Sequence, residues 1–182
     1  MLPGKIDFAP ILISLISLIA ALTDAWRGRI YNWLTLPGLI MGIVFWILQN
    51  GAAGFQFAII GVFVGFLILI WMYALKFLGA GDVKLLMALG AWGGAKFAVE
   101  TAFLSVVLGG MFAFFILLFR GRLLEFISKA YNFILGILMK EMKITPMKFD
   151  RTMKMPFGIP MAIAAIWITF ANPFAGMGVF PW

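Results

Sequence analysis

Long apolar stretches dominate the sequence, and short segments rich in polar residues or glycine separate them. Several stretches approach twenty residues, the length that an α-helix needs to cross a bilayer. Hydropathy and helix-breaking residues together predict six membrane-spanning helices. Their approximate ranges are Phe8–Leu22, Trp33–Leu48, Phe55–Phe77, Asp82–Trp92, Phe97–Phe119 and Pro156–Ala171. The pattern therefore predicts an all-α, polytopic membrane protein. The fourth segment is the shortest, and a partial helix that does not fully cross is its alternative.

The segment at 122–142 has a different pattern, in which two sets of residues alternate at helical spacing. One set is Arg122, Glu125, Lys129, Asn132, Gly136 and Lys140, and the opposite apolar set is Leu123, Ile127, Ala130, Ile134, Leu138 and Met142. This spacing predicts an amphipathic helix that lies in the membrane interface and is not a further span. We expect it to anchor a cytoplasmic loop, residues 120–155, to anionic lipid.

Composition agrees with a membrane protein and restricts the chemistry. Hydrophobic residues make up 64% of the chain and charged residues only 12%, which leaves too little polar surface for a soluble domain. We therefore expect one membrane-embedded domain over residues 1–182. Cysteine and histidine are absent, which excludes thiol nucleophiles, imidazole bases and Cys/His metal sites. Acid–base chemistry must come from the seven carboxylates, the lysines or the tyrosines. We expect no metal or organic cofactor.

The net charge of +7 indicates membrane topology, and we do not expect nucleic acid as a partner. Twelve of the fourteen lysines and arginines lie in three segments between apolar stretches, at 24–32, 76–84 and 120–154. A six-span chain places these three segments on one side, which the positive-inside rule makes cytoplasmic. Both termini then face outward. We read the first apolar stretch as a retained helix and not as a signal peptide.

Two aspartates lie at the predicted cytoplasmic boundary of the membrane. Asp24 directly follows the first stretch, and Asp82 ends the sequence LGAGD and begins the fourth. Two carboxylates at one depth suggest an aspartic protease, in which one accepts a proton from water and the other donates a proton. Gly79 and Gly81 would let an extended substrate approach Asp82. Simpler interpretations are that Asp82 is a helix N-cap and that Asp24 is a solvated residue paired with Arg27 or Arg29.

Three segments resemble the type IV prepilin peptidase family, which are membrane aspartic proteases with a G-x-G-D motif. They are Asp24 with Arg27 and RIYNWLTLPG (29–38), LGAGDVKLLMALGAW (78–92) and MPFGIPMAIAAI (155–166). Tyr31 stands where the family commonly has proline. The resemblance implies that Asp24 and Asp82 are catalytic, and we assign Gly79, Gly81, Lys84, Arg27 and Asn32 to substrate binding.

The resemblance further implies prepilin-like substrates, namely prepilins, pseudopilins or archaeal preflagellins, cut at the cytoplasmic face of the inner membrane. Longer family members carry an insert with paired C-x-x-C motifs that is associated with N-methylation. Because this sequence has no cysteine, we expect peptidase activity alone.

Other functions remain open at this point. Membrane aspartates also serve as ion or proton sites, so a small transporter or channel is the main alternative. A structural subunit of a pilus or secretion assembly is another, and a presenilin-like intramembrane protease is a third. Membrane lipid is an expected partner in each case, and the oligomeric state is left open.

Overall fold

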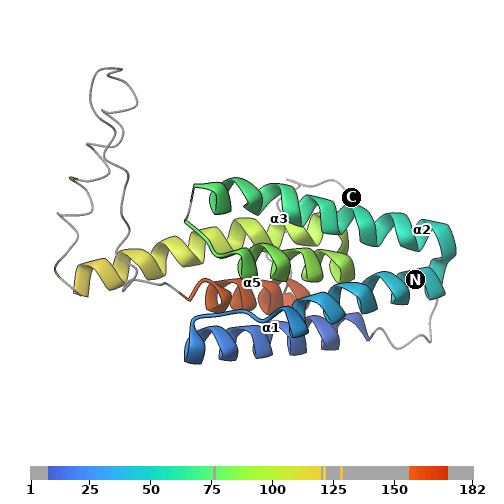
Figure 1. The fold of residues 1–182 in the computed structure, drawn as a ribbon, viewed down its shortest axis with the longest axis horizontal. Coiled ribbons are helices and arrows are strands. Elements are labelled where there is room, and N and C mark those ends of the chain that lie inside the picture. The colour runs from blue at the N-terminus through green and yellow to red at the C-terminus, as the bar shows by residue number, and fades with distance from the viewer. Residues whose placement is uncertain (1–7, 76, 120, 122–127, 129–155, 172–182) are drawn as a thin grey trace, which may run out of the picture. The chain divides into compact units, whose positions relative to one another are not determined.

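The computed structural model describes residues 8–75, 77–119, 121, 128 and 156–171. Its helices are α1 (Ala9–Arg27), α2 (Asn32–Ala74), α3 (Ala80–Phe119) and α5 (Gly158–Ala171) (Figure 1). No strand occurs among the described residues. The prediction of an all-α fold is therefore confirmed for this part of the chain.

Two of the helices are each interrupted at one glycine. Gly51 in α2 has φ 57° and ψ −131°, and Gly94 in α3 has φ 79° and ψ −175°. Glycine adopts positive φ without the steric penalty that a side chain would bring. Each long helix therefore consists of two helical segments, at 32–50 and 52–74 in α2 and at 80–93 and 95–119 in α3. These segments lie where the apolar pattern predicted the second to fifth helices.

Length and apolar character allow α1, α2 and α3 each to cross a membrane. The last helix, α5, is also apolar but has 14 residues. The chain is thus an apolar, helical membrane protein, while its six crossings remain a prediction. The predicted interfacial helix at 122–142 lies outside the described residues, apart from Ser128.

The chain divides into two compact units, one of residues 1–108 and 156–182 and the other of residues 109–155. In the smaller unit, the described residues include the last part of α3, where the rings of Phe114 and Phe115 meet edge to face at 5.9 Å. The larger unit contains the hydrophobic core and both aspartates. The single domain over residues 1–182 remains a prediction.

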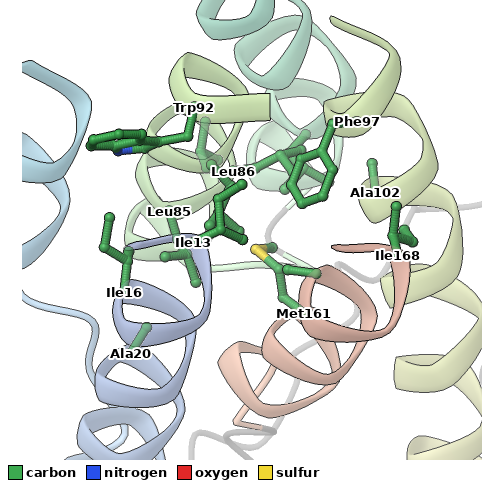
Figure 2. Packing of buried hydrophobic residues seen from close by; sticks show 14 of the residues in the cluster. Ile13, Ile16, Ala20, Leu85, Leu86, Trp92, Phe97, Ala102, Met161 and Ile168 are labelled. Atoms are coloured by element: carbon green, nitrogen blue, oxygen red, sulfur yellow. The ribbon is translucent and has the colours of Figure 1, made fainter. Parts of the chain in front are cut away.

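The core of the larger unit lies where α1, α3 and α5 meet. In Figure 1, α1 and α5 run side by side, and they pack closely. Figure 2 shows Ile13 and Ile16 of α1 facing Leu85 and Leu86 of α3, with Met161 of α5 beside them. This packing joins α1, the start of α3 and the start of α5 in one core, and these are the elements that carry the site.

A glycine contact brings the second half of α2 against the first half of α3. A Cβ atom added at Gly61 would collide with the carbonyl oxygen of Gly90, and one added at Gly90 would collide with that of Gly61. One turn along, a Cβ atom at Gly65 would lie 2.9 Å from the carbonyl oxygen of Leu86. Small residues four positions apart allow this close backbone approach between membrane helices.

Substituting Gly61 by alanine is expected to lower stability by roughly 1–3 kcal/mol, the usual cost of overpacking a tight contact. Gly110→Ala is the matched control, because a Cβ atom at Gly110 would meet nothing within 4 Å. Alanine is intrinsically the better helix former, so the control should be neutral or slightly stabilised. Thermal unfolding of both variants in detergent checks this. Equal midpoints for the two would show that the Gly61–Gly90 contact is not tight.

Candidate active site

Asp24 lies one turn before the end of α1 and is only 7% exposed. Its backbone carbonyl accepts a hydrogen bond from Gly28 N–H at 2.8 Å, where Gly28 ends the helix at φ 60°. Its carboxylate Oδ2 accepts a hydrogen bond from Gly158 N–H at 2.7 Å. Because Gly158 is the first residue of α5, the carboxylate lies at the positive end of that helix.

Glycine is required at position 158 by the closeness of this contact. A Cβ atom there would lie 2.8 Å from Asp24 Oδ2 and 3.0 Å from Asp24 Cβ. A side chain at this position would therefore displace the carboxylate that Gly158 N–H holds.

Asp82 lies in the first turn of α3 and is 8% exposed. Its Oδ2 accepts a hydrogen bond from Gly79 N–H at 2.9 Å, and its own N–H donates to Gly79 O at 3.1 Å. The bond from Gly79 N–H to the carboxylate three residues later is one half of a capping box, and the other half is absent because glycine has no side chain. Asp82 is therefore not the N-cap that the sequence allowed: α3 begins at Ala80, and Asp82 caps the free N–H of Gly79 from inside the first turn. Burial is an additional feature that a cap does not need.

The two carboxylates lie close enough to interact electrostatically with each other. Each is oriented by a backbone N–H at a helix start, Asp24 by α5 and Asp82 by α3. Arg27 does not pair with Asp24: its Nη1 donates to the Tyr31 hydroxyl at 3.1 Å, and its guanidinium lies 5.9 Å from the centre of the Tyr31 ring. The interpretation of Asp24 as a solvated, arginine-paired residue therefore does not describe this structure.

The turn after α1 packs against the start of α3. A Cβ atom at Gly81 would lie 3.0 Å from Ile30 Cβ and 3.2 Å from Ile30 O, so a larger residue would push this turn away. Lys84 Nζ donates a hydrogen bond to Asn32 Oδ1 at 2.9 Å. The structure thus joins two of the residues assigned to substrate binding, and both are exposed.

The Lys84–Asn32 pair is expected to contribute about 0.5–1 kcal/mol, because exposed polar pairs are weak. A double-mutant cycle with Lys84→Met and Asn32→Ala measures it through thermal stability. We expect each single variant to be slightly destabilised and the double variant to lose less than the sum. Strict additivity would mean that the hydrogen bond does not persist in solution.

An apolar cavity of about 330 Å³ lies beside the start of α3. Its lining includes Leu36 and Leu39 from α2, Phe66 and Ile70 from the second half of α2, and Val83 and Lys84 from α3. Lys84 thus stands at an apolar surface next to the G-x-G-D segment.

Sequence reasoning assigned no role to Gly158. The only signal was its position in the MPFGIP segment, a proline- and glycine-containing entry to the last helix. Among the described residues, no three His, Cys, Asp or Glu side chains form a group that could hold a metal ion. The acidic groups that the described residues bring to this site are two buried carboxylates, each held by a backbone N–H group.

The apolar helical fold and the two interacting, buried aspartates define the class of this protein. It is a polytopic membrane protein with a pair of acidic residues. The chain belongs to the type IV leader peptidase family, whose model matches residues 11–114. This range contains both Asp24 and Asp82.

Curated proteins that are similar to this chain have names related to that of this family. The chain is 33% identical over 127 residues to the prepilin leader peptidase/N-methyltransferase of Aeromonas salmonicida (strain A449), and 32% identical to that of Aeromonas hydrophila. Each alignment covers 66% of this chain and 43% of the relative, so the chain matches less than half of the relatives' length. No solved structure matches the chain.

Proposed function

We propose that the chain is a membrane aspartic endopeptidase that removes the basic leader peptide from prepilin-like proteins. The observation that carries this proposal is the pair of buried, electrostatically interacting carboxylates of Asp24 and Asp82. Family membership supports it, because the matched residues include both aspartates. Burying an acid in an apolar core costs free energy, and ionisable residues in membrane segments commonly mark functional sites.

In the proposed reaction the two aspartates share the proton transfers of hydrolysis. One carboxylate takes a proton from water, and the water oxygen attacks the carbonyl carbon of the scissile peptide bond. The other aspartate, protonated beforehand, donates a proton to the carbonyl oxygen. The C–N bond then breaks, and the leaving nitrogen receives a proton from the pair. Two carboxylates at close range suit this division, since only one of them ionises readily.

The hydrogen bonds from Gly79 and Gly158 would keep both carboxylates oriented before substrate arrives. Such positioning matters because catalytic groups must be held in the productive geometry. Gly79 would also leave room for the extended backbone that hydrolysis requires, whereas the space beside Gly81 is filled by Ile30. We propose that the apolar cavity beside Lys84 receives part of the substrate's apolar segment, with Arg27, Asn32 and Lys84 near the leader junction.

The proposed location is the inner membrane, with the active site at the cytoplasmic face. The charge distribution supports this orientation, because the segments that carry Asp24 and Asp82 belong to the lysine- and arginine-rich side. The cations of this face would bind anionic lipid. We propose peptidase activity alone, since the sequence contains no cysteine for the paired C-x-x-C motifs associated with methylation.

A cellular assay tests the proposal. Each of several prepilins and preflagellins is expressed with this chain in a host that lacks its own leader peptidase. We expect at least one substrate to shift to the size of the mature protein. If none of the panel is processed while the chain is present in the membrane, the peptidase proposal fails, and ion flux in liposomes becomes the next measurement.

A further inference from the structure

A second cavity of about 330 Å³ lies far from the aspartates, at the other end of α1. Ala9 and Pro10 of α1 and Ile168 and Thr169 of α5 contribute to its lining. Ala9 precedes Asp24 by 15 positions in one helix, which is about 22 Å at 1.5 Å per residue. The cavity is therefore separate from the candidate active site.

Glu100 is the acidic residue that lines this cavity. Its side chain is only 3% exposed, and its Oε1 has no hydrogen-bond partner among the described residues. Lys96, one helical turn earlier, also lines the cavity and interacts electrostatically with Glu100. A buried carboxylate oxygen without a donor is costly, so an unpaired one on a side chain that lines a cavity indicates a missing partner.

The aromatic walls of the cavity supply no donor for that oxygen. The indole N–H of Trp46 donates to Trp92 O at 2.9 Å, and that of Trp92 donates to Gly38 O at 2.8 Å. Phe57, whose ring lies 4.7 Å from that of Trp46, and Phe97 line the rest. Aromatic faces beside a carboxylate attract a cation, and an ammonium group is a compact cation that also donates hydrogen bonds.

We propose that this cavity binds a phosphoethanolamine group, with the ammonium on Glu100 Oε1 and the phosphate near Lys96. The opposite charges of Glu100 and Lys96 match the two charges of this group. The volume is at the lower end of the range for small-ligand sites, which suits a headgroup. Phe8, Ile11 and Phe55, close in sequence to lining residues, are exposed and apolar, which suits acyl chains beside the headgroup. A phospholipid is thus the source that the surroundings favour, and the site does not depend on the proposed peptidase activity.

Native mass spectrometry of the purified protein in detergent tests the proposal. Short-chain phosphatidylethanolamine, phosphatidylcholine and phosphatidylglycerol are titrated separately. We expect phosphatidylethanolamine to bind about tenfold more tightly than the other two, because among the three only its headgroup has a cation that donates hydrogen bonds to a carboxylate. Glu100→Gln should remove this preference. Thr101→Val should keep it, because Thr101 is an equally buried neighbour that does not line the cavity.

Two results would overturn the proposal: equal binding of all three lipids by the wild type, or an unchanged preference in Glu100→Gln. The wild-type comparison decides even if Glu100→Gln does not fold. Competition with free O-phosphoethanolamine distinguishes the sources of the group. If free O-phosphoethanolamine displaces the lipid at equal concentration, the site binds this group as a soluble ligand. If a large excess does not displace the lipid, the site binds the group as part of a phospholipid.

Discussion

Replacing either Asp24 or Asp82 by asparagine is expected to lower leader cleavage by roughly a thousandfold or more. General acid–base catalysis contributes about 10²–10⁴ to the rate, and neither aspartate can take over both proton transfers. Asparagine keeps the size of the side chain and an oxygen that can accept the hydrogen bond from Gly158 or Gly79. The fold should therefore survive, with unchanged helical circular dichroism and elution from a sizing column.

Asp150→Asn is the matched control, since it makes the same substitution in the sequence between α3 and α5. It should cleave at the wild-type rate. If Asp24→Asn or Asp82→Asn retains near-normal activity, the aspartate at that position has a structural role and not a catalytic one. For Asp82 this would leave the capping of Gly79 N–H as its whole role.

Gly158→Ala is expected to lower cleavage about tenfold to a hundredfold with little loss of helix. The added Cβ atom would lie 2.8 Å from Asp24 Oδ2, and the carboxylate must move or lose its hydrogen bond. A displacement near 1 Å at a catalytic group can cost about 10²-fold in rate. The measurement is the initial rate of leader removal at saturating substrate, compared with Gly110→Ala.

Gly110→Ala makes the same change in a helix with free space and should retain the wild-type rate. If Gly158→Ala and Gly110→Ala cleave equally well, the contact between Gly158 and Asp24 has no part in catalysis. The proposed dyad would then require another means of orienting Asp24.

Much of the helical arrangement could be predicted from the sequence. The apolar stretches predicted the helical segments, because each segment buries or exposes apolar surface over its whole length. The fourth segment was predicted to end at Trp92, and the break lies two residues later, at Gly94. The break at Gly51 likewise lies between the predicted second and third helices, which end at Leu48 and begin at Phe55.

The site was predicted in part. Asp24 and Asp82 could be selected because few acids occur in the chain and these two lie at helix boundaries. The hydrogen bond between Gly158 and Asp24 joins residues 134 positions apart, and no local pattern predicts such a contact. Likewise, Glu100 lies near the start of the predicted helix Phe97–Phe119, and its position there indicates nothing about its surroundings. Its burial in a cavity results from packing of α1, α2, α3 and α5 together.

The central claim is that the chain cuts a prepilin-like protein where the basic leader meets the apolar segment. The most direct measurement uses purified protein in liposomes with a purified prepilin, and mass spectrometry of the new amino terminus. We predict one cut at the leader junction, no cofactor requirement, and no product from Asp24→Asn or Asp82→Asn. A cut inside the apolar segment, or equal product from the wild type and both variants, would contradict the claim.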